Sequence, residues 1–191
     1  HVFTVRADLS TVPACRECIS EATEKLGGRI DILVNNAGLI PRLGMTLEST
    51  SETEYQQVMD VNLRAPFFLL QFAARTMGEG CSIINVGSFS AVRPLPSVTA
   101  YSMSKAALES LTKCAALELA PRGIRVNAIN PGTVITNIHK RAGMTEEAFA
   151  QYVEDNKAVH PLGRAGLPED CAELIAFLAS DGASWMTGEC V

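Results

Sequence analysis

Short apolar runs rich in β-branched residues alternate with longer stretches of helical spacing along the 191-residue chain. The strand-length runs are Val2–Val5, Ile30–Val34, Ser82–Val86 and Ile124–Ile129. The expected helices are Pro13–Leu26, Ser51–Met77, Ala100–Leu119 and Glu169–Leu178, and the stretch from Thr133 to Gly166 is the least regular. This alternation is typical of parallel strands joined by crossover helices. The sequence therefore predicts one α/β domain over residues 1–191, built on a doubly wound parallel sheet.

Composition and charge exclude several classes of function. With 47% hydrophobic and 19% charged residues, the chain falls among soluble globular proteins. The formal net charge is −5 and basic residues are scattered, so we expect no nucleic-acid partner. Apolar runs fall short of the roughly 20 residues that cross a bilayer, and no signal segment opens the chain. We expect no membrane partner and a cytoplasmic location, with organellar targeting left open. The six dispersed cysteines predict free thiols and no metal site.

A tyrosine and a lysine at helical spacing follow a buried strand. Tyr101 and Lys105 stand four residues apart, which places both side chains on one helix face. A phenol has a pKa near 10, and a neighbouring ammonium favours its phenolate form. Ser88 follows the strand Ser82–Val86 and precedes Tyr101 by 13 residues. A tyrosine as proton donor and a serine as second hydrogen-bond donor suit a carbonyl that receives a hydride.

Small and polar residues follow the other expected strands. The run Asn35-Asn36-Ala37-Gly38 follows the strand Ile30–Val34, and Asn130-Pro131-Gly132 follows Ile124–Ile129. Parallel sheets bind ligands at the carboxyl ends of their strands, where small residues let a cofactor approach the backbone. Asn62 stands among apolar neighbours in a helix and needs a polar partner if it is buried.

In these motifs the chain resembles the short-chain dehydrogenase/reductase family, in its non-extended branch. The matching residues are Asn35-Asn36-Ala37-Gly38, Asn62, Ser88, Tyr101 with Lys105, Asn130-Pro131-Gly132-Thr133, Leu162-Gly163-Arg164 and Pro168-Glu169-Asp170. Within the family, the chain looks most like members labelled 3-oxoacyl-carrier-protein reductase-like or glucose-dehydrogenase-like. The resemblance implies an NAD(P)-dependent oxidoreductase that interconverts a carbonyl and a secondary alcohol, acts on a small molecule and assembles as a homotetramer.

The resemblance also implies roles for individual residues. Asn62, Ser88, Tyr101 and Lys105 would form a catalytic tetrad, with Asn62 holding a water that connects Lys105 to solvent. The cofactor, NAD or with slight preference NADP, would be bound by Asp8, Leu9, Asn35, Ala37, Gly38, Tyr101, Lys105, Pro131, Gly132, Val134 and Thr136. From the residues alone, Asp8 could instead cap a turn, and Arg42, Arg93, His139 and His160 could be structural or face the substrate.

The family's opening strand and glycine-rich turn, which hold a cofactor pyrophosphate, have no counterpart in this sequence. The chain starts before the expected third strand, and it stops within Thr187–Val191, where the last strand is expected. We therefore expect a fold without its first two strands and its last, in a sequence that is incomplete at both ends. Two alternatives stay open: a catalytically silent binding or scaffold protein, and an epimerase or dehydratase of the extended branch, which shares Y-x-x-x-K.

Overall fold

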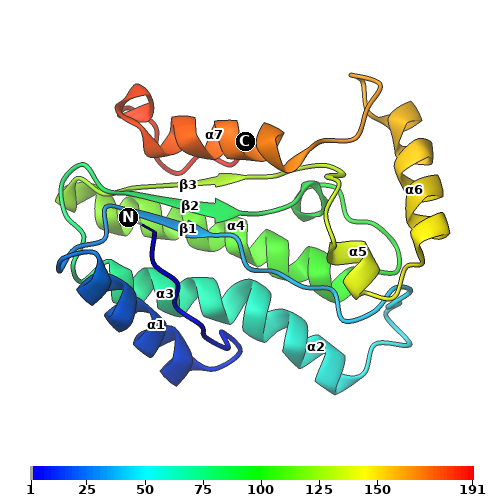
Figure 1. Cartoon of the computed structure of the whole chain (residues 1–191), viewed down its shortest axis with the longest axis horizontal. Helices are drawn as coiled ribbons and strands as arrows, with labels where there is room; N and C mark the ends of the chain where they lie inside the picture. The colour runs from blue at the N-terminus through cyan, green and yellow to red at the C-terminus, as the bar shows by residue number, and fades with distance from the viewer. Residues whose placement is uncertain (1) are drawn as a thin grey trace.

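A computed structural model describes residues 2–191 and shows a parallel sheet with helices on both faces (Figure 1). The strands are β1 (Ile32–Asn35), β2 (Ser82–Val86) and β3 (Arg125–Ile129), in the order β1-β2-β3. The helices α1 (Val12–Lys25), α3 (Ala65–Ala73) and α4 (Thr99–Leu119) cover one face, and α7 (Pro168–Ala179) covers the other. The remaining helices are α2 (Glu52–Met59), α5 (Ile138–Arg141) and α6 (Glu146–Val159). The expected α/β architecture is confirmed.

The central strand β2 divides two hydrophobic cores. Ile83 packs with residues of α1, α3 and α4, whereas Ile84 packs with Ile129 and with Leu178 of α7. Successive side chains of a strand point to opposite faces, so two adjacent isoleucines serve two layers. Both are fully buried. The sheet is thereby fixed between its helix layers, and the loops at its carboxyl edge have a rigid base.

A row of buried polar side chains links the sheet to α4. Asn35 donates to Asn85 Oδ1 at 2.9 Å, and Asn85 donates to Thr112 Oγ1 at 2.9 Å. Thr112 in turn donates to the carbonyl of Leu108 at 2.8 Å. Buried amides need such partners, since an unpaired one costs free energy. The row ties α4, the helix that carries Tyr101, to the middle of the sheet.

The structure corrects three expectations about secondary structure. Val2–Val5 forms no strand, because a strand needs a partner and no described strand lies beside this segment. The helix expected over Ser51–Met77 is divided by a π-helical turn, Asp60–Arg64, between α2 and α3. The stretch from Thr133 to Gly166 contains α5 and α6, where we expected irregular structure.

The C-terminal segment extends the sheet beside β3. Gly188 and Val191 donate backbone hydrogen bonds to Val126 and Ala128, and Ala128 donates to Glu189. Asn127 supports this segment from its side chain, which donates to Met186 O at 2.9 Å. The segment expected to become the last strand therefore already pairs in parallel with β3. Within residues 2–191, no helix has the length and apolar character to cross a membrane.

Candidate active site

The three strands end at one edge of the sheet, and each is followed by small or polar residues. Asn36, Ala37 and Gly38 follow β1, Gly87 and Ser88 follow β2, and Asn130-Pro131-Gly132 follows β3. The parallel register places Asn35 beside Asn85, and Val86 beside Ile129, so the three turns are neighbours. Such an edge is the usual ligand site of an open α/β sheet.

Asn62 holds the loop after β1 against the active-site helix. It is fully buried in the π-helical turn. Its Oδ1 accepts from the Leu39 amide at 2.9 Å, while its Nδ2 donates to Leu39 O at 3.0 Å and to Ser104 Oγ at 3.3 Å. Single π-turns within α-helices occur frequently at functional sites. This turn brings one side chain to both the loop after β1 and α4.

Lys105 places a buried amine at the carboxyl end of β2. Its residue surface is 3% exposed, and Nζ donates to the Val86 carbonyl at 2.7 Å. Burial disfavours the ammonium form and lowers the pKa of Lys105 to about 8. A Cβ at Gly38 would lie 3.5 Å from Nζ and 3.6 Å from Asn62 Oδ1. Gly38 thus packs directly beside both the amine and Asn62.

Tyr101 and Ser88 face each other across the same space. Burial raises the pKa of Tyr101, a hydrogen bond with Ser88 lowers it, and nearby Tyr152 raises it further. We expected Lys105 to lower this pKa, but Nζ lies 5.7 Å from the centre of the tyrosine ring and is bonded to Val86 O. The amine thus stands over the ring, and Lys105 is not among the causes of the shift in the Tyr101 pKa. In this geometry Ser88 is the group that favours the phenolate.

The turn after β3 holds Ser88 in place. Its amide donates to Asn130 Oδ1 at 3.1 Å, and the Asn130 amide group is held in turn by Glu109 of α4. A Cβ at Gly87 would lie 2.1 Å from Asn130 Oδ1, closer than atoms can pack, and in a tight contact of 3.0 Å with Ile129 O. Gly87 is thus required for the β2 and β3 turns to meet. Sequence reasoning placed Asn130 in a turn but missed this positioning role and Glu109.

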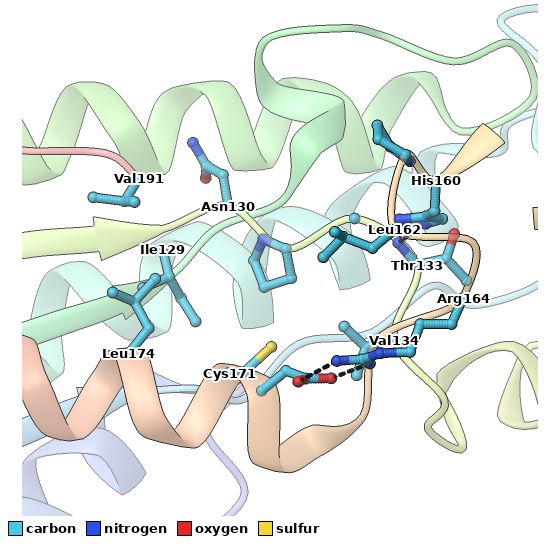
Figure 2. A pocket seen from close by; sticks show the side chains of 15 residues that line it. Ile129, Asn130, Thr133, Val134, His160, Leu162, Arg164, Cys171, Leu174 and Val191 are labelled. Carbon is cyan, nitrogen blue, oxygen red and sulfur yellow. Dashed lines mark hydrogen bonds and ion pairs between the residues drawn. The ribbon is translucent and has the colours of Figure 1, made fainter. Parts of the chain in front are cut away.

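The segment after β3 lines a cleft of about 400 Å³ that reaches α7 (Figure 2). Pro131, Gly132 and Val134 are part of its wall. The carbonyl of Thr133 accepts from Gly166 at 2.9 Å, and the Ile135 amide donates to Gly166 O at 2.9 Å, so two backbone bonds flank Val134. Thr136 is exposed and accepts from the Ile138 amide at 3.4 Å. Arg164 and Asp170 form a two-armed ion pair beside Val134, with bonds of 2.6 and 2.7 Å.

Other candidate residues have local structural partners. Asp8 accepts from the Ser10 amide at 3.0 Å, which is a turn before α1, and Leu9 packs against the core beneath the sheet. Among the described residues, no hydrogen bond joins Asp8 to the tetrad. Arg42 bonds Glu54 and the carbonyl of Ser49, so it braces the start of α2.

The residues at the edge fit a nicotinamide cofactor. Asn36, Ala37 and Gly38 are exposed, and Asn35 Oδ1 is buried without a hydrogen-bond partner. A lysine amine, whose three protons make it a multiple donor, lies beside this glycine cradle. Sheet, turns and side chains together define a Rossmann-type α/β protein whose ligand edge resembles that of dinucleotide-binding proteins.

Comparison with known proteins names the family. A family model described as Enoyl-(Acyl carrier protein) reductase matches residues 1–191. Dehydrogenase/reductase SDR family member 4 of Homo sapiens is 39% identical over 178 residues, which are 92% of this chain and 62% of that protein. The L-2,3-butanediol dehydrogenase of Corynebacterium glutamicum is 39% identical over 179 residues, with 90% of this chain and 68% of that enzyme covered. The chain belongs to the short-chain dehydrogenase/reductase family.

Solved structures agree with this assignment. A short-chain dehydrogenase of Burkholderia cenocepacia in complex with NADP superposes with a TM-score of 0.86 at 33% identity. The alignment covers 98% of this chain and 73% of that one. The chain thus spans between about three fifths and three quarters of the length of these relatives.

Gly87→Ala should reduce kcat about a hundredfold, because displacing Asn130 moves Ser88 from its place beside Tyr101. Gly78→Ala is the matched control, since no atom lies within 4 Å of its added Cβ. Both variants are assayed for carbonyl reduction in the purified protein. Equal rates in the two variants would contradict the positioning role of Asn130.

Lys105 should make the stability of the cofactor-free protein rise with pH above pH 8. Below about pH 8, the folded-state pKa of Lys105, the amine is charged in both the folded and the unfolded protein, and burying that charge destabilises the folded state in full. Above it, the unfolded chain still binds the proton up to about its ordinary 10.5, so unfolding becomes less favourable. The measurement is the free energy of unfolding in urea of the wild type minus that of Lys105→Met.

This difference should increase with a slope of up to about 1.4 kcal/mol per pH unit between these limits. Lys113→Met on the same helix is the control, because the Lys113 side chain is 59% exposed. The free energy of unfolding of the wild type minus that of Lys113→Met should not change with pH in this range. A flat profile for Lys105→Met would disprove the burial cost.

Proposed function

We propose that the protein interconverts a carbonyl compound and a secondary alcohol by hydride transfer, with NAD or NADP as cofactor and a small molecule as substrate. The observation that carries this proposal is the meeting of Ser88, Tyr101 and Lys105 at the carboxyl end of β2. The family and the dehydrogenase names of the relatives support the same reaction class.

The bound nicotinamide supplies or accepts the hydride. The protein's own task is then to manage charge and a proton at the substrate oxygen. During reduction, the Tyr101 hydroxyl donates its proton to that oxygen and Ser88 provides a second hydrogen bond. Because the pKa of Tyr101 is raised, the phenol is protonated at neutral pH and ready to act as an acid. In the reverse direction, its phenolate removes the proton from the alcohol.

Lys105 and Asn62 complete the proposed tetrad. Lys105 has donors left beyond the one used on Val86, and these suit the ribose hydroxyls of the cofactor. The Asn62 side chain is engaged by Leu39 and Ser104, so we assign the water that links Lys105 to solvent to the Asn62 backbone. This water completes a route by which Tyr101 can recover its proton.

The cofactor would lie along the strand ends, with Asn35, Ala37 and Gly38 beneath it and Pro131, Gly132, Val134 and Thr136 at its nicotinamide end. Asp8 and Leu9 would approach the adenine. NADP is slightly preferred over NAD, and the NADP complex of the Burkholderia relative supports it. The presence of all four tetrad residues in the chain favours turnover over a silent scaffold, and the Asn35–Gly38 run favours a dehydrogenase over an epimerase.

We also propose a homotetramer of single-domain subunits in the cytoplasm. The described residues pack around one sheet, which supports a single domain. Large apolar side chains are exposed on α3 and α4, among them Phe67, Met103 and Leu117. Exposed apolar side chains on these two helices suit an interface between subunits.

Tyr101→Phe should lower kcat about a hundredfold to ten-thousandfold, because the phenyl ring has no proton to transfer. Fluorescence titration with NADH and NADPH should show that cofactor binding persists, which separates loss of chemistry from loss of binding. Tyr55→Phe, an exposed tyrosine of α2, serves as the control and should retain wild-type kcat. Wild-type turnover by Tyr101→Phe would refute the proposed mechanism.

The tetramer has its own test in sedimentation equilibrium of the purified protein. We expect four times the subunit mass, and a lower mass for Leu117→Glu, whose side chain is 79% exposed on α4. Leu47→Glu, exposed to a similar degree in a loop, should remain tetrameric. A monomeric wild-type protein would end the proposal of a tetramer.

A further inference from the structure

Ser90 lies two residues beyond Ser88, in the 3₁₀ helix Phe89–Ala91 that follows β2. Its residue surface is only 4% exposed, whereas Ser88 is partly exposed at the edge of the sheet. The sequence motifs selected Ser88 and passed over its neighbour. Neither the proposed tetrad nor the proposed cofactor site gives this buried hydroxyl a role.

Two hydrogen bonds join Ser90 to the side-chain oxygen of Ser88. Ser90 Oγ donates to Ser88 Oγ at 3.0 Å, and the Ser90 amide donates to the same oxygen at 3.2 Å. A serine hydroxyl has one proton to donate and two lone pairs that accept. Ser90 therefore fills both acceptor positions of Ser88, and Ser88 has only its own proton left to offer.

The backbone around Ser88 is held from the turn after β3. The Ser88 amide donates to Asn130 Oδ1 at 3.1 Å, and the Phe89 amide donates to the Pro131 carbonyl at 3.0 Å. These bonds join segments about 42 residues apart, as the first bond shows. The two serines are thus presented to each other by a backbone that is fixed on both sides of Ser88.

The hydroxyl bond between the serines goes beyond ordinary turn geometry. A serine oxygen that accepts the amide two residues on is a common local turn, and here it caps the 3₁₀ helix. The hydroxyl bond is a second, separate contact. Elsewhere in β2 a buried serine hydroxyl bonds a backbone carbonyl, as Ser82 does with Leu178 O at 3.1 Å. The Ser90 hydroxyl is instead directed at a side chain of the proposed active site.

The filled oxygen of Ser88 sets the direction of its hydrogen bond with Tyr101. Because Ser88 has no acceptor position left, it must be the donor and the Tyr101 oxygen the acceptor. Such a bond favours the phenolate, which agrees with its lowering effect on the pKa of Tyr101. Hydrogen bonds in series polarise one another, so donation from Ser90 makes Ser88 a stronger donor.

We infer that Ser90 is a positioning residue for the reaction, which makes Ser88 a donor only by occupying its oxygen with two hydrogen bonds. Ser88 can then bind the substrate oxygen as carbonyl or as alcohol, but it cannot accept the alcohol proton, which is left for Tyr101. This inference rests on the proposed oxidoreductase function.

The first experiment measures carbonyl reduction by Ser90→Ala, which loses the hydroxyl bond and keeps the amide bond. The probe is the one of diacetyl, butanone and acetophenone that the wild type reduces fastest. We expect kcat/KM to fall about tenfold, less than the loss of a donor that touches the substrate. Ser90→Thr retains a hydroxyl and should recover to within about threefold of the wild type.

Ser82→Ala is the matched control. Ser82 is fully buried in the same strand region and its hydroxyl also donates one hydrogen bond, so its removal costs similar stability away from the site. This variant should keep wild-type kcat/KM. If Ser90→Ala folds poorly, Ser90→Cys replaces it, because a thiol fills the space of the hydroxyl and is only a weak donor.

The second experiment is a double-mutant cycle between the two serines. Ser88→Ala alone should lower kcat/KM about a hundredfold, since it removes the donor itself. Adding Ser90→Ala to it should change the rate by less than about twofold, because Ser90 acts only through the Ser88 oxygen. A merely structural role of Ser90 predicts instead that the two losses multiply to about a thousandfold.

The outcomes separate this inference from the proposed function. Wild-type protein that reduces none of the three probes would count against the oxidoreductase function, and the inference would fall with it. An active wild type whose two serine losses multiply, or in which Ser90→Thr loses as much as Ser90→Ala, would overturn the role of Ser90 alone.

Discussion

A buried amine at the carboxyl end of β2 is the constraint on which the site depends. Lys105 joins α4 to the sheet through the carbonyl of Val86, at a cost seen in its lowered pKa. One acceptor satisfies one of its donors, so the fold carries a charge that it does not fully pair. Gly38 stands beside the amine, and a Cβ there would lie 3.5 Å from Nζ. The buried charge that destabilises the fold therefore lies at the site of the proposed chemistry.

Amide side chains give this edge of the sheet its rigidity. Asn62 holds the loop after β1, Asn85 connects the sheet to α4, and Asn130 holds the turn after β2. Each joins segments that are distant in the sequence, and each bonds backbone or a buried partner. Hydrogen bonds from these three asparagines therefore hold the loops that would contact cofactor and substrate.

The sequence predicted the parts of the site that have local signatures. Tyr101 and Lys105 follow from helical spacing, and Ser88 from its place after a buried strand. The sequence could not predict that Glu109 holds Asn130 and that Asn130 holds Ser88. Asn130 is 42 residues from Ser88 and 21 from Glu109, and only the folded sheet brings them together. Val2–Val5 has strand composition, but pairing decides whether a strand forms. For α6, Thr145 as N-cap followed by Glu146 was a readable start signal that the apparent irregularity obscured.

The electrostatics of Tyr101 show why pairwise spacing alone could not predict its acidity. A lysine one helical turn away lies over the ring, and it directs one of its protons to the carbonyl of Val86. The pKa of the Tyr101 hydroxyl is set by burial, which raises it, and by the Ser88 hydrogen bond, which lowers it, and burial has the larger effect. The chain's own residues therefore hold Tyr101 as an acid.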